Sequence, residues 1–175
     1  MRNTSIINFV GQPSAGKSTL SHGLMYRMKM DLMSVEHVSE FAKDLTWENN
    51  MQALSNQIYV TGSQAQRLER IVGKVDYIIT DSPLLLSVFY TPERYPEAFK
   101  ATVIELFKQY DNMNYFVKRV KPYNPDGRNQ TAKEADKLAD TIYSALSFYK
   151  IPFTEITGDE AGLAKVYKDV LKRKK

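Results

Sequence analysis

The sequence contains no cysteine, which excludes disulfide bonds and metal sites built from thiolates. It has no apolar run of about 18 residues or more, the length that would cross a membrane, and no signal peptide. Residues 1–4 lead directly into an apolar, β-branched run. We therefore expect a cytoplasmic protein with no membrane partner. Its 175 residues are 43% hydrophobic and 25% charged, which suits one domain (1–175) with its own core.

The charge balance is slightly basic, with a formal net charge of +4. Part of the excess lies in the run Lys172–Lys175, where a basic tail can contact nucleic acid. Cations near the C-terminal end of a helix are also favourable on their own, so a solvated helix end explains this run. The remaining positive charge fits a site that handles phosphates.

One stretch carries a specific chemical signal, the sequence GQPSAGKST at residues 11–19. It has the form G-x-x-x-x-G-K-[ST] of a phosphate-binding loop, or P-loop. The apolar run at residues 5–10 precedes it, and Leu20, Leu24 and Met28 follow at helical spacing. Strand, loop and helix therefore occur in the order that the motif requires, which makes a chance match in a Gly/Ser turn a poor explanation.

The P-loop predicts that the protein binds ATP and Mg²⁺. Glycines let backbone N–H groups turn toward the phosphates, and the following helix directs its positive end to the same place. Lys17 is expected to reach the β- and γ-phosphates and to assist transfer, and the Ser18 hydroxyl to hold Mg²⁺. The residues that we expect to bind the nucleotide are Gly11, Ser14, Ala15, Gly16, Lys17, Ser18 and Thr19.

Strand and helix patterns alternate along the whole chain, without internal repeats, low-complexity tracts or linkers. Ser39 is expected to cap a short helix, Thr131 and Glu134 have capping-box spacing, and Gly73 is placed to end a long helix. Residues 47–50 are predicted to be irregular. We predict strands at 5–10, 33–38, 75–81, 113–117 and 152–156, and helices at 17–29, 40–45, 54–72, 84–90, 97–110, 131–149 and 159–172.

This alternation predicts an α/β fold, the three-layer P-loop NTPase fold with a five-stranded parallel sheet flanked by helices. In such sheets, ligands bind beyond the C-terminal ends of the strands. Residues that follow the predicted strands are therefore the candidates for chemistry.

Three carboxylates lie at or near such positions. Asp81 ends an apolar strand and is expected to hold Mg²⁺, directly or through water, although Asp is also a common helix cap. Glu36 and Glu40 lie near the end of the second strand, where a carboxylate can accept the proton of an acceptor hydroxyl. We favour Glu40 as the general base because it opens a helix. Pairing with the dipole of that helix is the alternative.

The basic, turn-rich segment at about 118–131 is predicted to be a lid over the site. In phosphoryl transfer, an arginine from a closing loop can neutralise charge on the transferred group. Arg128 is our first candidate for this catalytic role and Arg119 the second, and a solvated basic loop is the alternative. Closure would also exclude water.

Other ring-bearing residues are weaker candidates. His37 is expected to be an ordinary strand residue rather than a catalyst. Trp47, Tyr59, Phe89 and Tyr90 can stack on a base, but aromatic residues in a small domain usually belong to the core.

Several motifs occur together in the order found in a known family: the P-loop, EFAK at 40–43, the helix containing residues 57–67, DSP at 81–83, and DGRNQ at 126–130. In this respect the chain resembles small P-loop kinases typified by the nicotinamide riboside kinase domain of bacterial NAD regulators. It also resembles phage AAA-type ATPases, some of which are similar to enzymes that phosphorylate hydroxymethyluracil in phage DNA. The resemblance implies ATP and Mg²⁺ use, a lid arginine, and an acceptor hydroxyl on a nucleoside-like compound or on modified DNA. For a phage protein, the expected location is the host cytoplasm.

The sequence thus favours an ATP-dependent kinase in nucleotide metabolism, with alternatives left open. A switch GTPase would need an N-K-x-D guanine reader, and the sequence has none. A motor or remodelling ATPase normally has a longer chain with sensor elements. A non-kinase P-loop ATPase and a nucleic-acid-binding NTPase both remain possible readings of the P-loop and the basic lid. The acceptor and the oligomeric state stay open.

Overall fold

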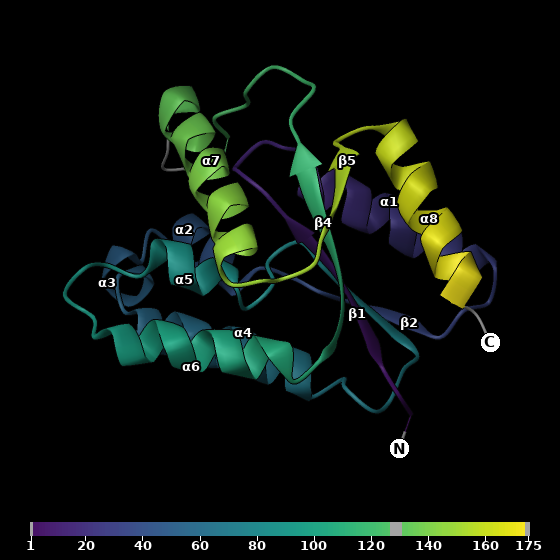
Figure 1. The fold of residues 1–175 in the computed structure, drawn as a ribbon, viewed down its shortest axis with the longest axis horizontal. Helices are drawn as coiled ribbons and strands as arrows, with labels where there is room; N and C mark the ends of the chain where they lie inside the picture. Colours follow the sequence, from purple (N-terminus) through teal and green to yellow (C-terminus); the bar gives the residue numbers. More distant parts are fainter. Residues whose placement is uncertain (1, 127–130, 174–175) are drawn as a thin grey trace.

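The computed structural model of the chain describes residues 2–126 and 131–173 (Figure 1). None of the helices in these two ranges is long and apolar enough to span a membrane. The elements within them are, in chain order, β1 (Ser5–Val10), α1 (Lys17–Met30), β2 (Val35–Val38), α2 (Phe41–Trp47), α3 (Met51–Leu54), α4 (Gln57–Glu69), β3 (Tyr77–Thr80), α5 (Leu86–Tyr90), α6 (Glu97–Lys108), β4 (Asp111–Lys118), α7 (Ala132–Phe148), β5 (Thr154–Thr157) and α8 (Glu160–Arg173).

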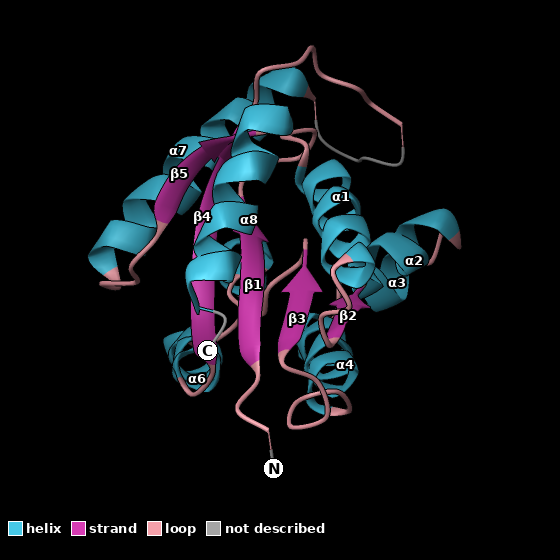
Figure 2. Cartoon of the chain, turned by 90° about the vertical axis from the view of Figure 1, so that its right-hand side faces the viewer, coloured by secondary structure: helices cyan, strands magenta, loops and turns pink. Residues whose placement is uncertain are grey.

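The strands of the described chain form one five-stranded sheet in the order β2-β3-β1-β4-β5 (Figure 2). Every neighbouring pair is parallel, and β1 lies in the middle between β3 and β4. Parallel strands need crossover connections, and here helices provide them and cover both faces. The predicted α/β fold, with a five-stranded parallel sheet between helices, is confirmed.

The sheet separates two hydrophobic cores. Side chains of β1 alternate between them: Ile6 and Val10 point into one, Ile7 and Phe9 into the other. Residues of α4 to α7 complete the first core, and residues of α1 and α8 complete the second, as the two sides of the ribbon in Figure 1 show. Burial on both faces explains why β1 reads as a nearly continuous apolar run.

The helix predicted over 54–72 starts too early and ends too late: α4 covers Gln57–Glu69, and Leu54 instead ends a separate short helix, α3 (Met51–Leu54), that the sequence did not predict. The side chain of Asn50 accepts a hydrogen bond from the Ala53 N–H (3.1 Å) and begins α3, and that of Asn56 accepts from the Tyr59 N–H (3.2 Å) and begins α4. Each asparagine satisfies a backbone donor that a helix start leaves open, so the chain breaks between them. The prediction that 47–50 is irregular was wrong at Trp47, where α2 ends.

The predicted helix caps have mixed outcomes. The capping box of Thr131 and Glu134 is present at the start of α7. Ser39 is not the cap of α2: Glu40 occupies the N-cap position, and no side-chain cap of its own forms among the described residues. The backbone N–H of Phe41 instead donates to Gln64 Oε1 of α4 (2.9 Å), so a residue 23 positions away supplies the acceptor.

Candidate active site

The P-loop connects the C-terminal end of β1 to the first turn of α1. Gly11 and Gly16 have φ values of 149° and 99°, and Ser14 also lies in the left-handed region at 64°. A Cβ atom on Gly16 would lie 2.8 Å from the carbonyl oxygen of Gly158, and one on Gly158 would lie 1.9 Å from that of Ala15. The segment between β5 and α8 therefore packs directly against the P-loop, and both positions require glycine.

Lys17 is the first residue of α1, and Gly16 is its N-cap. The Lys17 ammonium donates hydrogen bonds to the carbonyl oxygens of Gly11 and Gln12, at 2.9 Å each. The side chain therefore folds back over the loop, which places its charge above the N-terminal end of α1. An anion bound to this helix end would lie next to the ammonium group.

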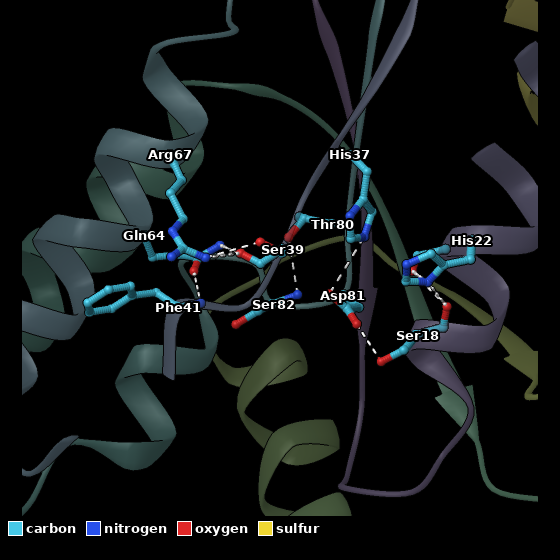
Figure 3. Close-up of polar contacts among 11 residues, drawn as sticks. Ser18, His22, His37, Ser39, Phe41, Gln64, Arg67, Thr80, Asp81 and Ser82 are labelled. Carbon is cyan, nitrogen blue, oxygen red and sulfur yellow. Dashed lines mark hydrogen bonds and ion pairs between the residues drawn. The ribbon is translucent and has the colours of Figure 1, made fainter. Parts of the chain in front are cut away.

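Ser18 and Asp81, predicted from separate motifs, are in contact. Ser18 Oγ donates to Asp81 Oδ2 at 2.5 Å, although 63 positions separate the two residues (Figure 3). Asp81 follows β3, which pairs with β1, so the ends of two neighbouring strands bring the hydroxyl and the carboxylate together.

The Ser18–Asp81 pair suits a magnesium ion that also binds a nucleotide. Asp81 is buried at 6% exposure, and its Oδ1 atom has no hydrogen-bond partner within the described residues. A buried carboxylate oxygen without a partner is costly unless a ligand supplies one. No cluster of three or more His, Cys, Asp or Glu residues that could hold a metal ion occurs in the described part of the chain. Mg²⁺ fits this sparse set because it commonly takes one or two protein oxygens, with waters and phosphates as its other ligands.

His37 lies next to Asp81, a neighbour that the sequence did not predict. Its Nε2 atom is 3.8 Å from Asp81 Oδ1, and the ring of His22 lies 4.9 Å from that of His37 (Figure 3). Burial lowers the pKa of His37; the charge of Asp81 opposes this shift and that of His22 adds to it. His37 comes close to Asp81 because β2 pairs with β3, which sets His37 opposite Ile79, two residues before Asp81. This pairing depends on the tertiary fold and not on local sequence.

Glu40, the predicted general base, lies directly after β2 as the N-cap of α2. It is half-buried, and Tyr90 of α5 is near enough for the Glu40 charge to act on it. Burial, and then that charge, raise the pKa of the Tyr90 hydroxyl. Glu36, the carboxylate within β2, instead pairs with Lys29 at 2.8 Å, near the far end of α1. The structure thus sets Glu40 toward α5 and ties Glu36 to a surface pair.

A network of α4 side chains fixes the segment that carries Glu40. Gln64 Nε2 donates to the Ser39 carbonyl oxygen (3.2 Å), while Gln64 Oε1 accepts from the Phe41 N–H. Arg67 donates to Ser39 Oγ (3.0 Å) and lies over the Phe41 ring (Figure 3). It also pairs with Asp44 at 2.5 Å. The backbone on both sides of Glu40 is therefore held in place.

The same helix presents polar atoms that lack partners. Gln57 and Thr61 are one turn apart on α4 and buried at 6% and 7% exposure. Gln57 Oε1 and Thr61 Oγ1 have no hydrogen-bond partners within residues 2–126 and 131–173. Of the aromatic candidates, Phe89 packs against the core and Trp47 and Tyr59 are exposed, whereas Tyr90 is 38% exposed and so keeps most of its surface buried.

The predicted lid begins at the end of β4 and contacts the P-loop. The backbone N–H of Asn124 donates to Ser14 Oγ at 2.9 Å. Arg119, the second candidate for the lid arginine, pairs with Asp136 of α7 (2.6 Å) and lies over the Tyr123 ring. Arg119 therefore anchors the base of the lid to α7. Arg128, the first candidate, lies outside the described residues.

This arrangement of sheet, P-loop and Ser18–Asp81 pair is a P-loop kinase-like NTPase fold. Comparison with solved structures agrees: the chain is similar to the deoxyadenosine kinase from M. mycoides with bound dATP. The TM-score is 0.55 and the sequence identity 15%, and the match covers 96% of this chain and 98% of that chain. At this identity, the likeness concerns the fold.

The chain belongs to the AAA domain family, whose model matches residues 6–161. A search of curated proteins found no match. The expected resemblance is thus confirmed at the level of a P-loop kinase-like NTPase. The narrower likeness to nicotinamide riboside kinases and to phage enzymes stays a prediction.

Proposed function

We propose that this protein is an ATP-dependent kinase that transfers the γ-phosphate to a hydroxyl of a nucleoside- or nucleotide-like acceptor. The observation that carries the proposal is the Ser18–Asp81 contact beside Lys17 at the start of α1. It joins the hydroxyl and the carboxylate that P-loop enzymes use to hold a nucleotide-bound magnesium ion. The shared fold with a nucleoside kinase supports the same class of reaction.

At the nucleotide end, backbone N–H groups of the P-loop bind the phosphates of ATP. Lys17 exchanges the Gly11 and Gln12 carbonyl oxygens for phosphate oxygens, since a full negative charge is the stronger partner. Ser18 and Asp81 hold Mg²⁺, which when bound offsets the charge of the phosphates. The residues proposed to bind ATP are Gly11, Ser14, Ala15, Gly16, Lys17, Ser18 and Thr19.

At the acceptor end, Glu40 takes the proton from the acceptor hydroxyl. The oxygen of that hydroxyl bonds to the γ-phosphorus, and the bond to ADP breaks. Arg128 from the lid neutralises the transferred group. The acceptor lies between α2, α4 and α5, where Tyr90 is close to Glu40, and where Gln57 and Thr61 have buried oxygens without partners in the described chain. A polar acceptor that donates hydrogen bonds would satisfy those two oxygens.

Replacing Glu40 by glutamine should lower kcat about 100-fold, because the amide keeps the size of the side chain but cannot accept the proton. The KM for ATP should change little, since Glu40 lies beyond β2 rather than on the P-loop. Steady-state kinetics with the best acceptor measures both constants. Glu36→Gln is the matched control. If Glu36→Gln abolishes turnover and Glu40→Gln does not, the general base is Glu36.

The proposal is tested by a screen with γ-labelled ATP over nucleosides, nucleotides, nicotinamide riboside and DNA that contains hydroxymethyluracil. Label should move to at least one hydroxyl-bearing acceptor in the presence of Mg²⁺. Release of free phosphate at the same rate with and without every acceptor would instead favour a non-kinase ATPase. Binding of nucleic acid without transfer would favour a nucleic-acid-binding NTPase.

DNA is the acceptor that the net charge of +4 favours over a free small molecule. If DNA is the acceptor, its affinity should fall steeply as salt rises, because binding releases counterions from the phosphates. Fluorescence anisotropy of a labelled oligonucleotide between low and physiological salt measures this slope. An affinity that does not depend on salt would favour the small acceptor.

A further inference from the structure

His37 has its imidazole beside the cation site without being bound to it. Its side chain is 17% exposed, and that of Asp81 is 8% exposed. His37 Nε2 and Asp81 Oδ1 are 3.8 Å apart and face each other, as Figure 3 shows, which is too long for a direct hydrogen bond. Neither atom has another hydrogen-bond partner in the described ranges.

Two buried polar atoms at this distance need a common partner. Leaving each without a partner is costly, whereas a water between them would satisfy both. The other Asp81 oxygen already accepts from Ser18, so Oδ1 is the oxygen that remains for a ligand. His37 Nε2 therefore faces the carboxylate oxygen that remains for a cation or its water.

We propose that His37 is a positioning residue of this cation site: its Nε2 and Asp81 Oδ1 bind the same water molecule, and the imidazole thereby fixes the carboxylate for Mg²⁺. This rests on the proposed function, because it takes Ser18 and Asp81 as the residues that hold nucleotide-bound Mg²⁺. The imidazole acts through Asp81 and touches neither ATP nor the acceptor. Outer partners of metal ligands commonly contribute 10- to 100-fold to metal affinity.

The surroundings of His37 hold its ring in one orientation. Strand β2 pairs with β3 from Val35 to Val38, so the backbone that carries His37 is fixed relative to Asp81. The ring of His22 packs on one side at 4.9 Å, and its Nδ1 atom lies 2.6 Å from the Ser18 carbonyl oxygen.

Three substitutions of His37 separate positioning from packing. A glutamine side chain can place its amide nitrogen where Nε2 of histidine lies, whereas asparagine reaches only as far as Nδ1 and leucine keeps the bulk without a polar atom. His37→Gln should therefore rescue what His37→Asn and His37→Leu lose. Glu36→Gln, on the neighbouring position of β2, is the control, because its carboxylate pairs with Lys29.

The readout is binding of a non-hydrolysable ATP analogue by calorimetry, with MgCl₂ titrated from zero and with EDTA as the metal-free state. Mg²⁺ should strengthen binding of the analogue. We expect His37→Leu and His37→Asn to need about tenfold more Mg²⁺ than the wild type for half of this effect. Binding in EDTA should stay at the wild-type value, and His37→Gln should stay within about threefold of wild type in Mg²⁺. Thermal melting shows that each variant is folded, and if His37→Leu is not, the Gln and Asn pair decides.

Three results would overturn the assignment. Unchanged Mg²⁺ dependence in His37→Leu or His37→Asn would mean that the imidazole does not position the site. Equal weakening in Mg²⁺ and in EDTA would mean that it only supports the P-loop, as would a folded His37→Gln that binds as poorly as His37→Leu. If the wild type binds no nucleotide, this inference and the proposed function fail together. If the wild type binds in a Mg²⁺-dependent way that His37 does not affect, the inference alone fails.

Discussion

Replacing Lys17 by alanine is expected to reduce phosphoryl transfer about 10³-fold and to leave the protein folded. The Lys17 ammonium is the cation of the P-loop and lies at the N-terminal end of α1, where the γ-phosphate would bind. In the free protein it contacts two loop carbonyl oxygens that water can solvate instead, so its loss should cost little stability. Label transfer from ATP and a thermal melt measure the two effects.

Lys29→Ala is the control for this variant. Lys29 is also on α1, but its ammonium pairs with Glu36 near the opposite end of the helix. Exposed pairs of this kind contribute about 0–1 kcal/mol, so Lys29→Ala should transfer phosphate like the wild type. Full activity in a folded Lys17→Ala protein would refute the kinase assignment.

Replacing Arg128 by alanine should lower kcat about 10³-fold while the affinity for ATP changes far less. An arginine that meets the transferred group only during the reaction stabilises the transition state more than the bound substrate. Single-turnover kinetics together with equilibrium ATP binding separates the two effects.

Two further lid variants make this test specific. Lys121→Ala removes an equal charge from the exposed part of the lid and should keep kcat close to the wild-type value. Arg119→Ala breaks the pair with Asp136 of α7 and should act mainly on stability. If Arg119→Ala lowers kcat about 10³-fold and Arg128→Ala changes only the KM for ATP, the catalytic arginine is Arg119.

Local sequence signals were sufficient for most of the fold. The P-loop, its flanking strand and helix, and the capping box of Thr131 and Glu134 each depend on residues within a few positions of one another. The break between α3 and α4 was missed because the apolar positions kept a helical period through it. The hydrogen bonds that end one helix and begin the next come from Asn50 and Asn56, which also occur often in ordinary helix surfaces and turns.

Contacts between distant segments decided the rest of the site. Gln64 caps α2 in place of Ser39, a choice fixed by the packing of α4 on α2. The position of Asp81 beside the P-loop could be predicted because Asp81 ends an apolar strand, and the carboxyl ends of parallel strands lie at one edge of the sheet. The position of His37 could not be predicted. Its closeness to Asp81 depends on β2 being the neighbour of β3, and the spacing of residues along the chain does not determine strand order.

The tight approach of Gly158 to Ala15 has a consequence for how this protein is made. The P-loop leaves the ribosome well before the turn against which it packs, because that turn is built from residues that follow β5. We expect a nascent chain to remain unable to capture ATP until residues 154–173 have emerged. The proposed nucleotide site would then form only after β5 and α8 have been made.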